Sequence, residues 1–250
     1  MIDAHAHIHE ADFPFEWAEV LQNAQDAGIN QIITVGTSVK DSRLAAKFAE
    51  QHDEVFALVG IHPGEVIDGG LAELREIIEK SPKIVGFGDV GLDYHYENSQ
   101  NTPQEQKELL KKILSLALER NLPVSFHVRD AFDDFWSIFD EFKGRIRGVL
   151  HSFTGSEDDL AKALQRGLFI GVNGIVTFAG DVREVIRKCP LKSIILETDA
   201  PFLAPAKLRG QQNQPANVAE VARFLARLYK VEVSVVDEIT SKNTKELFKI

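Results

Sequence analysis

The chain has 250 residues, with 28 Lys and Arg against 38 Asp and Glu, so its formal net charge is −10. Hydrophobic residues make up 44% and charged residues 26% of the sequence, which is typical of globular proteins. The negative balance argues against a broad basic surface for nucleic acid, although metal ions could hold such a substrate locally. No apolar segment approaches the roughly 18 residues of a membrane helix, and the first residues lack the basic and apolar regions of a signal peptide.

The single cysteine, Cys189, excludes an intrachain disulfide and fits a reducing compartment, so a cytoplasmic location is predicted. Nothing in the sequence indicates an obligate protein partner.

Short apolar segments alternate with amphipathic ones along the chain, and each kind predicts one type of element. The apolar segments predict buried parallel strands at Ile2–His9, Ile29–Val35, Val55–Gly60, Ile84–Gly88, Pro123–Val128, Gly148–His151, Phe169–Val172 and Ser193–Glu197. The amphipathic segments predict helices at Pro14–Ala27, Ser42–Gln51, Gly70–Lys80, Thr102–Arg120, Ala131–Phe142, Ser156–Arg166, Asp181–Lys188, Ala216–Tyr229 and Val235–Phe248.

Eight strand–helix units predict a closed (β/α)₈ TIM barrel that forms a single domain over residues 1–250. The alternative is a doubly wound open sheet. That fold would normally carry a Gly-rich phosphate turn after its first strand, and this sequence has none there.

Polar side chains gather at the ends of the predicted strands, which is where barrel enzymes carry their active sites. His5 and His7 are two residues apart at the end of the first strand, so both can point to one side and hold one ion. Later strand ends supply His62, Asp89, His127, Arg129, His151, Glu197 and Asp199. One histidine at a strand end is usually an ordinary polar group, but this clustering favours a site for zinc or a similar divalent ion. Four histidines and two carboxylates exceed one tetrahedral shell, which predicts two metals with one carboxylate bridging.

Six motifs in order carry a resemblance to a known family. They are Ile2-Asp3-Ala4-His5-Ala6-His7, Val59-Gly60-Ile61-His62-Pro63, Gly91-Leu92-Asp93-Tyr94, Phe126-His127-Val128-Arg129-Asp130-Ala131, Leu150-His151-Ser152-Phe153-Thr154-Gly155-Ser156 and Leu196-Glu197-Thr198-Asp199-Ala200-Pro201. With these the sequence resembles, over essentially its whole length, the TatD family of metal-dependent deoxyribonucleases in the amidohydrolase-like superfamily.

The resemblance implies a role for each candidate residue. His5, His7 and Asp199 would hold the first metal, and His127 and His151 the second. Asp89 would bridge the two ions. His62 and Glu197 would line the phosphate or reactive-water side of the site.

The chain departs from the family pattern at three places. Asp89 stands where the family usually has Glu, so a bridging carboxylate is one methylene shorter. The loop Arg209-Gly210-Gln211-Gln212-Asn213-Gln214-Pro215 carries neutral amides where the family usually has two cations and one anion, which weakens any grip on phosphate. Gly64 follows His62-Pro63, where the family often has a histidine.

The predicted activity is metal-dependent hydrolysis by an activated water, on one or two ions of Zn, Mg or Mn. Asp199 would accept the proton, Glu197 is a second candidate catalytic residue, and His62 and Arg129 would bind substrate. The favoured reaction is cleavage of single-stranded DNA, as a 3′→5′ exonuclease. A carbonyl hydrolase or deacylase on the same barrel is the alternative. The third hypothesis is a non-enzymatic relative that binds metal but has lost turnover.

Overall fold

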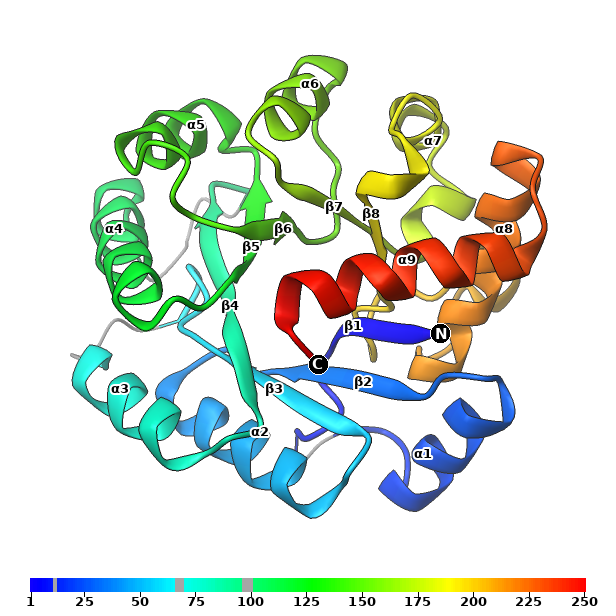
Figure 1. Ribbon diagram of the computed structural model, residues 1–250, viewed down its shortest axis with the longest axis horizontal. Coiled ribbons are helices and arrows are strands. Elements are labelled where there is room, and N and C mark those ends of the chain that lie inside the picture. Colours follow the sequence, from blue (N-terminus) through cyan, green and yellow to red (C-terminus); the bar gives the residue numbers. More distant parts are fainter. Residues whose placement is uncertain (11–12, 66–69, 96–100) are drawn as a thin grey trace. The chain divides into compact units, whose positions relative to one another are not determined.

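The computed structural model describes residues 1–10, 13–65, 70–95 and 101–250, in which strands alternate with helices (Figure 1). The strands are β1 (Ile2–Ala6), β2 (Gln31–Val35), β3 (Val55–Val59), β4 (Ile84–Asp93), β5 (Val124–Arg129), β6 (Gly148–Leu150), β7 (Phe169–Val172) and β8 (Ile194–Leu196). The helices are α1 (Trp17–Asp26), α2 (Val39–Gln51), α3 (Leu71–Lys80), α4 (Pro103–Arg120), α5 (Phe132–Glu141), α6 (Glu157–Gln165), α7 (Gly180–Ile186), α8 (Val218–Tyr229) and α9 (Val233–Phe248).

The strands form one sheet in the order β1 to β8. Each strand pairing that can be followed residue by residue is parallel. Ala6 and Ala200 form a further parallel bridge between the end of β1 and the segment that follows β8. This strand order, with a helix after each strand, is that of the predicted (β/α)₈ class.

The chain divides into two compact units, residues 1–34 with 152–250 and residues 35–151. In the first unit, α9 packs against both β1 and β8 (Figure 1). Asn243 on α9 reinforces this contact, because its amide donates to the carbonyl of Ile194 at 2.7 Å. One helix therefore supports the two strands that lie farthest apart in the sequence.

The second unit is built around the pairing of β4 with β5. Four consecutive register pairs run from Val90 with Phe126 to Asp93 with Arg129. Behind these strands lies an aromatic core in which Phe126 and Phe135 are fully buried, with ring centroids 5.1 Å apart. The core makes this pair of strands a firm base for the polar side chains that they carry.

Element types agree with the sequence prediction, but two strand boundaries were wrong in ways that matter for the site. β1 ends at Ala6 and not at His9, because the chain turns after His7. β4 extends to Asp93 and not to Gly88, because residues 90–93 stay paired with β5. Asp89 therefore lies inside a strand. The predicted helix start at Thr102 is confirmed, since Thr102 and Glu105 form the reciprocal hydrogen bonds of a capping box.

Among the residues that the structure describes, no helix combines the length and the apolar character needed to cross a membrane.

The close approach of β4 to β5 yields a test of stability. A Cβ added at Gly91 would lie 1.7 Å from the carbonyl oxygen of His127, so Gly91→Ala forces the strands apart. We expect a loss of about 3 kcal/mol in the free energy of unfolding, measured by urea titration. Gly180→Ala is the control, because nothing lies within 4 Å of its added Cβ. Its stability should stay within about 0.5 kcal/mol of wild type. Equal midpoints for the two variants would contradict this account of the pairing.

Candidate metal centre

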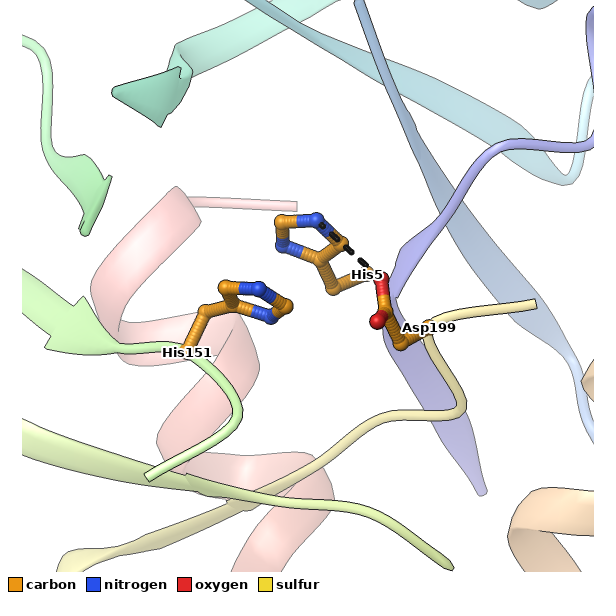
Figure 2. Close-up of side chains that lie close together, drawn as sticks. All are labelled: His5, His151 and Asp199. Atoms are coloured by element: carbon orange, nitrogen blue, oxygen red, sulfur yellow. Dashed lines mark ion pairs between the residues drawn. The ribbon is translucent and has the colours of Figure 1, made fainter. Parts of the chain in front are cut away.

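Three side chains of the first unit come together as the β1–β8 ligand set, defined as His5, His7 and Asp199. The Nε2 atom of His5 lies 3.9 Å from Oδ1 of Asp199 (Figure 2), and Nε2 of His7 lies 3.4 Å from the same oxygen. The two imidazole rings meet edge to face at 5.2 Å. His5 is fully buried, while the Asp199 side chain keeps 13% of its surface exposed. The set is thus largely withdrawn from water, with its carboxylate at the accessible side.

Backbone hydrogen bonds place this set. The N–H of Asp199 donates to the carbonyl of His5 at 2.8 Å, and the N–H of His7 donates to the carbonyl of Ala200 at 2.7 Å. His7 therefore stays aligned with the segment after β8 although it lies beyond the end of β1. The prediction that His5 and His7 act together rests on their spacing, and the structure brings both to one carboxylate.

A buried carboxylate, Asp3, ties β1 to the same segment. Asp3 accepts the N–H of Thr198 at 2.8 Å and its hydroxyl at 2.5 Å. Burial raises the pKa of Asp3 to about 8, and the negative charge of Glu197 adds to this, although hydrogen bonds from Thr198 and the N–H of His5 oppose it. Asp3 was not among the candidate site residues predicted from the sequence.

The loop after β8 is held by Asn213. Its side-chain amide donates to the carbonyls of Thr198 (2.9 Å) and Phe202 (2.7 Å), and its backbone N–H donates to the carbonyl of Pro201 (2.9 Å). Asn213 is fully buried, whereas the Phe202 side chain is 56% exposed. Within the loop that was considered for phosphate binding, this asparagine acts on the backbone around Asp199.

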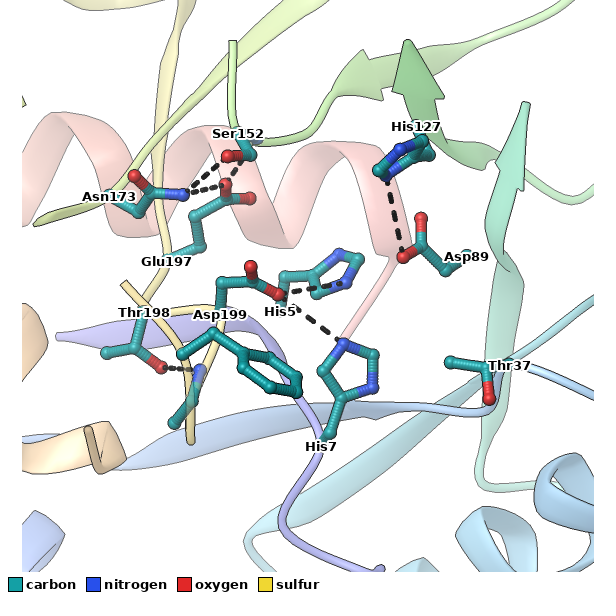
Figure 3. A network of polar contacts seen from close by, with 12 residues as sticks. His5, His7, Thr37, Asp89, His127, Ser152, Asn173, Glu197, Thr198 and Asp199 are labelled. Atoms are coloured by element: carbon teal, nitrogen blue, oxygen red, sulfur yellow. Dashed lines mark hydrogen bonds and ion pairs between the residues drawn. The ribbon is translucent and has the colours of Figure 1, made fainter. Parts of the chain in front are cut away.

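Glu197 makes contacts that differ from those of Asp199. Its Oε1 accepts the backbone N–H of Ser152 at 2.5 Å and the amide of Asn173 at 3.4 Å (Figure 3). Asn173 also donates to the hydroxyl of Ser152 at 2.9 Å. Glu197 is buried, so these bonds fix the residue that directly follows His151 in the chain. Sequence analysis missed Asn173, although its position directly after β7 is the signal that marked the other candidates.

In the second unit, Asp89, His127 and His151 form the β4–β6 ligand set. One ligand atom of each lies within 4.8 Å of the others. Nδ1 of His127 is 3.9 Å from Oδ2 of Asp89 (Figure 3), and the rings of His127 and His151 have centroids 5.8 Å apart. His151 directly follows β6, which ends one residue earlier than predicted, whereas Asp89 and His127 lie within their strands. Asp89 and His151 are buried.

The two residues predicted to bind substrate lie near His127. The ring of His62 packs edge to face on that of His127 with centroids 4.5 Å apart. Nδ1 of His62 accepts the N–H of Gly64 at 3.0 Å. Since a neutral imidazole has one donor and one acceptor, Nε2 of His62 carries the proton and is a hydrogen-bond donor. Arg129 ends β5, opposite Asp93 in the register.

Asp93 is a second carboxylate beside His127 that sequence analysis did not assign. Its Oδ2 lies 3.0 Å from Nε2 of His127, and its Oδ1 accepts the N–H of His95 at 2.9 Å. Burial opposes its ionisation. Hydrogen bonds from His127 and His95, with the positive charge of Arg129, nevertheless hold the pKa of Asp93 below its ordinary value.

The donor atoms of both sets fit a divalent transition metal. Each set offers two imidazoles and one carboxylate, which is the donor chemistry of zinc and related ions. Two ligands of one tetrahedral zinc, each about 2.1 Å from it, lie about 3.4 Å apart. The separations from Asp199 Oδ1 to His7 (3.4 Å) and His5 (3.9 Å) are close to this value. So is the 3.9 Å between His127 and Asp89.

Comparison with known proteins gives the family. Residues 2–249 match the family described as TatD related DNase. The chain is 34% identical over 256 residues to the metal-dependent hydrolase YabD of Bacillus subtilis, covering 100% of this chain and 99% of the relative. It is 30% identical over 260 residues to the 3′-5′ ssDNA/RNA exonuclease TatD of Escherichia coli, with the same coverage. The crystal structure of the E. coli TatD homolog YjjV superposes with a TM-score of 0.92 at 32% identity, covering 100% of this chain and 98% of that one.

The chain belongs to the TatD-related DNase family, and the resemblance inferred from six motifs is confirmed. The (β/α)₈ fold class is confirmed by the same structural likeness. A TatD family hydrolase of Entamoeba histolytica shares the fold at 21% identity, with a TM-score of 0.90. The prediction of a metal-dependent hydrolase of the TatD DNase class is confirmed at the level of the family.

The buried Asp3 generates a prediction on pH and stability. Its folded pKa of about 8 lies above the ordinary 3.8, so between these values the folded chain holds a proton that the unfolded chain releases. Wild type should therefore lose about 1.4 kcal/mol per pH unit from this group as pH rises through that window. Asp3→Asn keeps the shape and the bonds to Thr198 but cannot ionise.

We expect the stability of Asp3→Asn relative to wild type to grow from pH 5 to pH 8, in urea titrations with chelator present. A difference that stays constant over this range would show that Asp3 is ionised throughout.

Proposed function

We propose that this chain is a metal-dependent exonuclease that removes nucleotides from the 3′ end of single-stranded nucleic acid, with DNA as the main substrate. The observation that carries the proposal is the pair of ligand sets, each with two imidazoles and one carboxylate. The relative named as a 3′-5′ ssDNA/RNA exonuclease, similar along its whole length, supports the reaction and its polarity.

Each ligand set would hold one divalent ion that can engage a substrate phosphate. Most residues of the two sets lie at or just beyond the C-terminal ends of strands, where barrel enzymes hold their reacting groups, and Asp89 lies farther back within β4. Zinc suits these imidazole-rich sets better than magnesium or manganese, which prefer oxygen ligands. Bound ions supply an activated water at neutral pH and stabilise charge that develops on phosphate oxygens.

The chain's own residues divide the remaining tasks. Asp199 keeps part of its side chain exposed, so it can accept the proton of the attacking water. His62 presents an Nε2–H donor, which suits a phosphate oxygen and explains its proposed role in substrate binding. Glu197, also a candidate catalytic residue, would act chiefly by holding Ser152 and Asn173.

Binding of a polyanion by a chain of net charge −10 must depend on local contacts. The ions, His62 and Arg129 are the groups that would supply them. We propose the cytoplasm as the location, supported by the single buried cysteine, Cys189. The family relationship does not favour a carbonyl hydrolase, which becomes an outcome of the test.

The decisive experiment combines metal analysis with a substrate panel. His5→Ala with His7→Ala should lower the number of ions bound per chain. It should also reduce release of nucleotides from a 5′-labelled single strand by more than about 100-fold, since loss of even an outer partner costs about 10–100-fold. His52→Gln is the matched control, because His52 lies at the end of α2 outside both ligand sets.

The panel includes duplex DNA, RNA and an aminoacyl ester, each with and without chelator. Cleavage of the ester with an intact oligonucleotide would establish the carbonyl hydrolase instead. Undiminished nucleotide release by the double variant would contradict the metal assignment.

The shorter carboxylate at position 89 gives a second test. Asp89→Asn should lose the ion of the β4–β6 ligand set, because a neutral amide is a poorer metal ligand than a carboxylate. Asp89→Glu restores the reach that the family usually has, so its activity should equal or exceed wild type. For each variant, mass spectrometry measures the metal content and an oligonucleotide assay measures turnover. If Asp89→Asn matches wild type in both, Asp89 is not a ligand.

A further inference from the structure

His127 lies between two carboxylates, and only one of them belongs to a ligand set. In the register of β4 and β5, His127 pairs with Gly91, and Asp89 and Asp93 stand two residues to either side of that glycine. The Nδ1 atom of His127 faces Asp89 at 3.9 Å, and Nε2 faces Asp93 at 3.0 Å. The first distance exceeds a hydrogen bond, whereas the second is a normal one.

We propose that Asp93 is the positioning residue of the β4–β6 ligand set. It accepts the proton on Nε2 of His127, so the lone pair of that imidazole is on Nδ1 and faces Asp89, ready to bind a metal. A carboxylate behind a ligating histidine fixes its tautomer and ring orientation and raises its basicity. The proposal rests on His127 being a metal ligand, as assigned above, and not on the identity of the substrate.

Asp93 is itself held too firmly to follow the ring. Its Oδ1 accepts the N–H of His95, so each carboxylate oxygen has its own donor. The side chain of Gln106 on α4 grips the Asp93 backbone, accepting its N–H at 2.8 Å and donating to its carbonyl at 3.0 Å. Asp93 and Gln106 are both buried. Apart from His127, two partners therefore hold Asp93: the His95 N–H binds its carboxylate, and the Gln106 side chain binds its backbone.

A rival reading would make His62, Asp93 and His127 a metal site, since one ligand atom of each lies within 4.8 Å of the others. The hydrogen bonds argue against it. Nδ1 of His62 accepts the N–H of Gly64, which leaves the proton on Nε2 and no lone pair there for a metal. The 3.0 Å contact of Asp93 with His127 is likewise that of a donor with an acceptor.

Asp93→Asn tests the proposal through the chemistry of the amide. The N–H of His95 can only donate, so the amide oxygen of the new side chain must face it, and the NH₂ group then faces His127. A donor at that position favours the opposite tautomer, with the proton on Nδ1 and the lone pair turned away from Asp89. The variant should therefore bind the ion of this set about 10–100-fold more weakly.

Two measurements follow, both on the full chain. Nitrogen-15 NMR of the metal-free protein reports the tautomer of His127, with the signal assigned by its loss in His127→Ala. Wild type should show the Nε2–H form and Asp93→Asn the Nδ1–H form. Titration with Zn²⁺ or Mn²⁺ gives the affinity, and circular dichroism confirms that the variants are folded. Asp130→Asn is the matched control, because Asp130 pairs with the exposed His95 and not with His127.

The outcomes distinguish failure of the Asp93 proposal from failure of the metal assignment on which it rests. If His127→Ala binds as much metal as wild type, His127 is not a ligand and the metal assignment fails. If His127→Ala loses the ion while Asp93→Asn keeps both the Nε2–H tautomer and the wild-type affinity, the role of Asp93 is overturned. If His62→Gln weakens metal binding as much as Asp93→Asn, the rival site is correct and the proposal is wrong.

Discussion

The hydrogen-bonded register between neighbouring parallel strands is the constraint on which both ligand sets depend. The backbone hydrogen bonds between strands determine which side chains lie next to one another at the strand ends. In the first unit, the bond from the N–H of Asp199 to the carbonyl of His5 brings together residues almost 200 positions apart in the chain. In the second, the pairing of Gly91 with His127 places one carboxylate at each end of an imidazole ring. The geometry of the candidate site is thus largely backbone geometry.

Buried acids then make that geometry rigid. Asp3 bonds Thr198 across β1 and β8, Glu197 bonds Ser152, and Asp93 bonds His127. None of the three needs an ion to have its hydrogen bonds, since each accepts a backbone or imidazole N–H. They contact the backbone or the rings at or beside the candidate metal ligands His5, His151 and His127, and they limit how far those groups can move. Such support is what holds reacting groups within the small tolerances that catalysis demands.

Sequence alone could predict the elements and the first layer of the site. Apolar periodicity marks buried strands, and residue types at strand ends mark candidate ligands such as His5 and His151. The supporting layer could not be predicted. Asp3 hydrogen-bonds Thr198 and Asp93 hydrogen-bonds His127. These partners are remote in sequence, and no local sequence pattern predicts such a pairing. The length of β4 was hidden for a related reason. Gly88-Asp89-Val90-Gly91 has the composition of a turn, and the strand continues because Val90 to Asp93 pair with β5.

Charge links this architecture to the proposed substrate. The chain carries an excess of ten negative charges, and several carboxylates lie at or behind the ligand sets. Buried carboxylates that keep their charge need compensation, because an unpaired ion in a protein interior is costly. Histidines bring neutral donors and only partial relief, so the same acids that repel a phosphate chain favour the uptake of cations. Ions bound there would reverse the local sign and turn an anionic cluster into a phosphate-binding centre. A strongly acidic chain can in this way act on a polyanion without a basic surface.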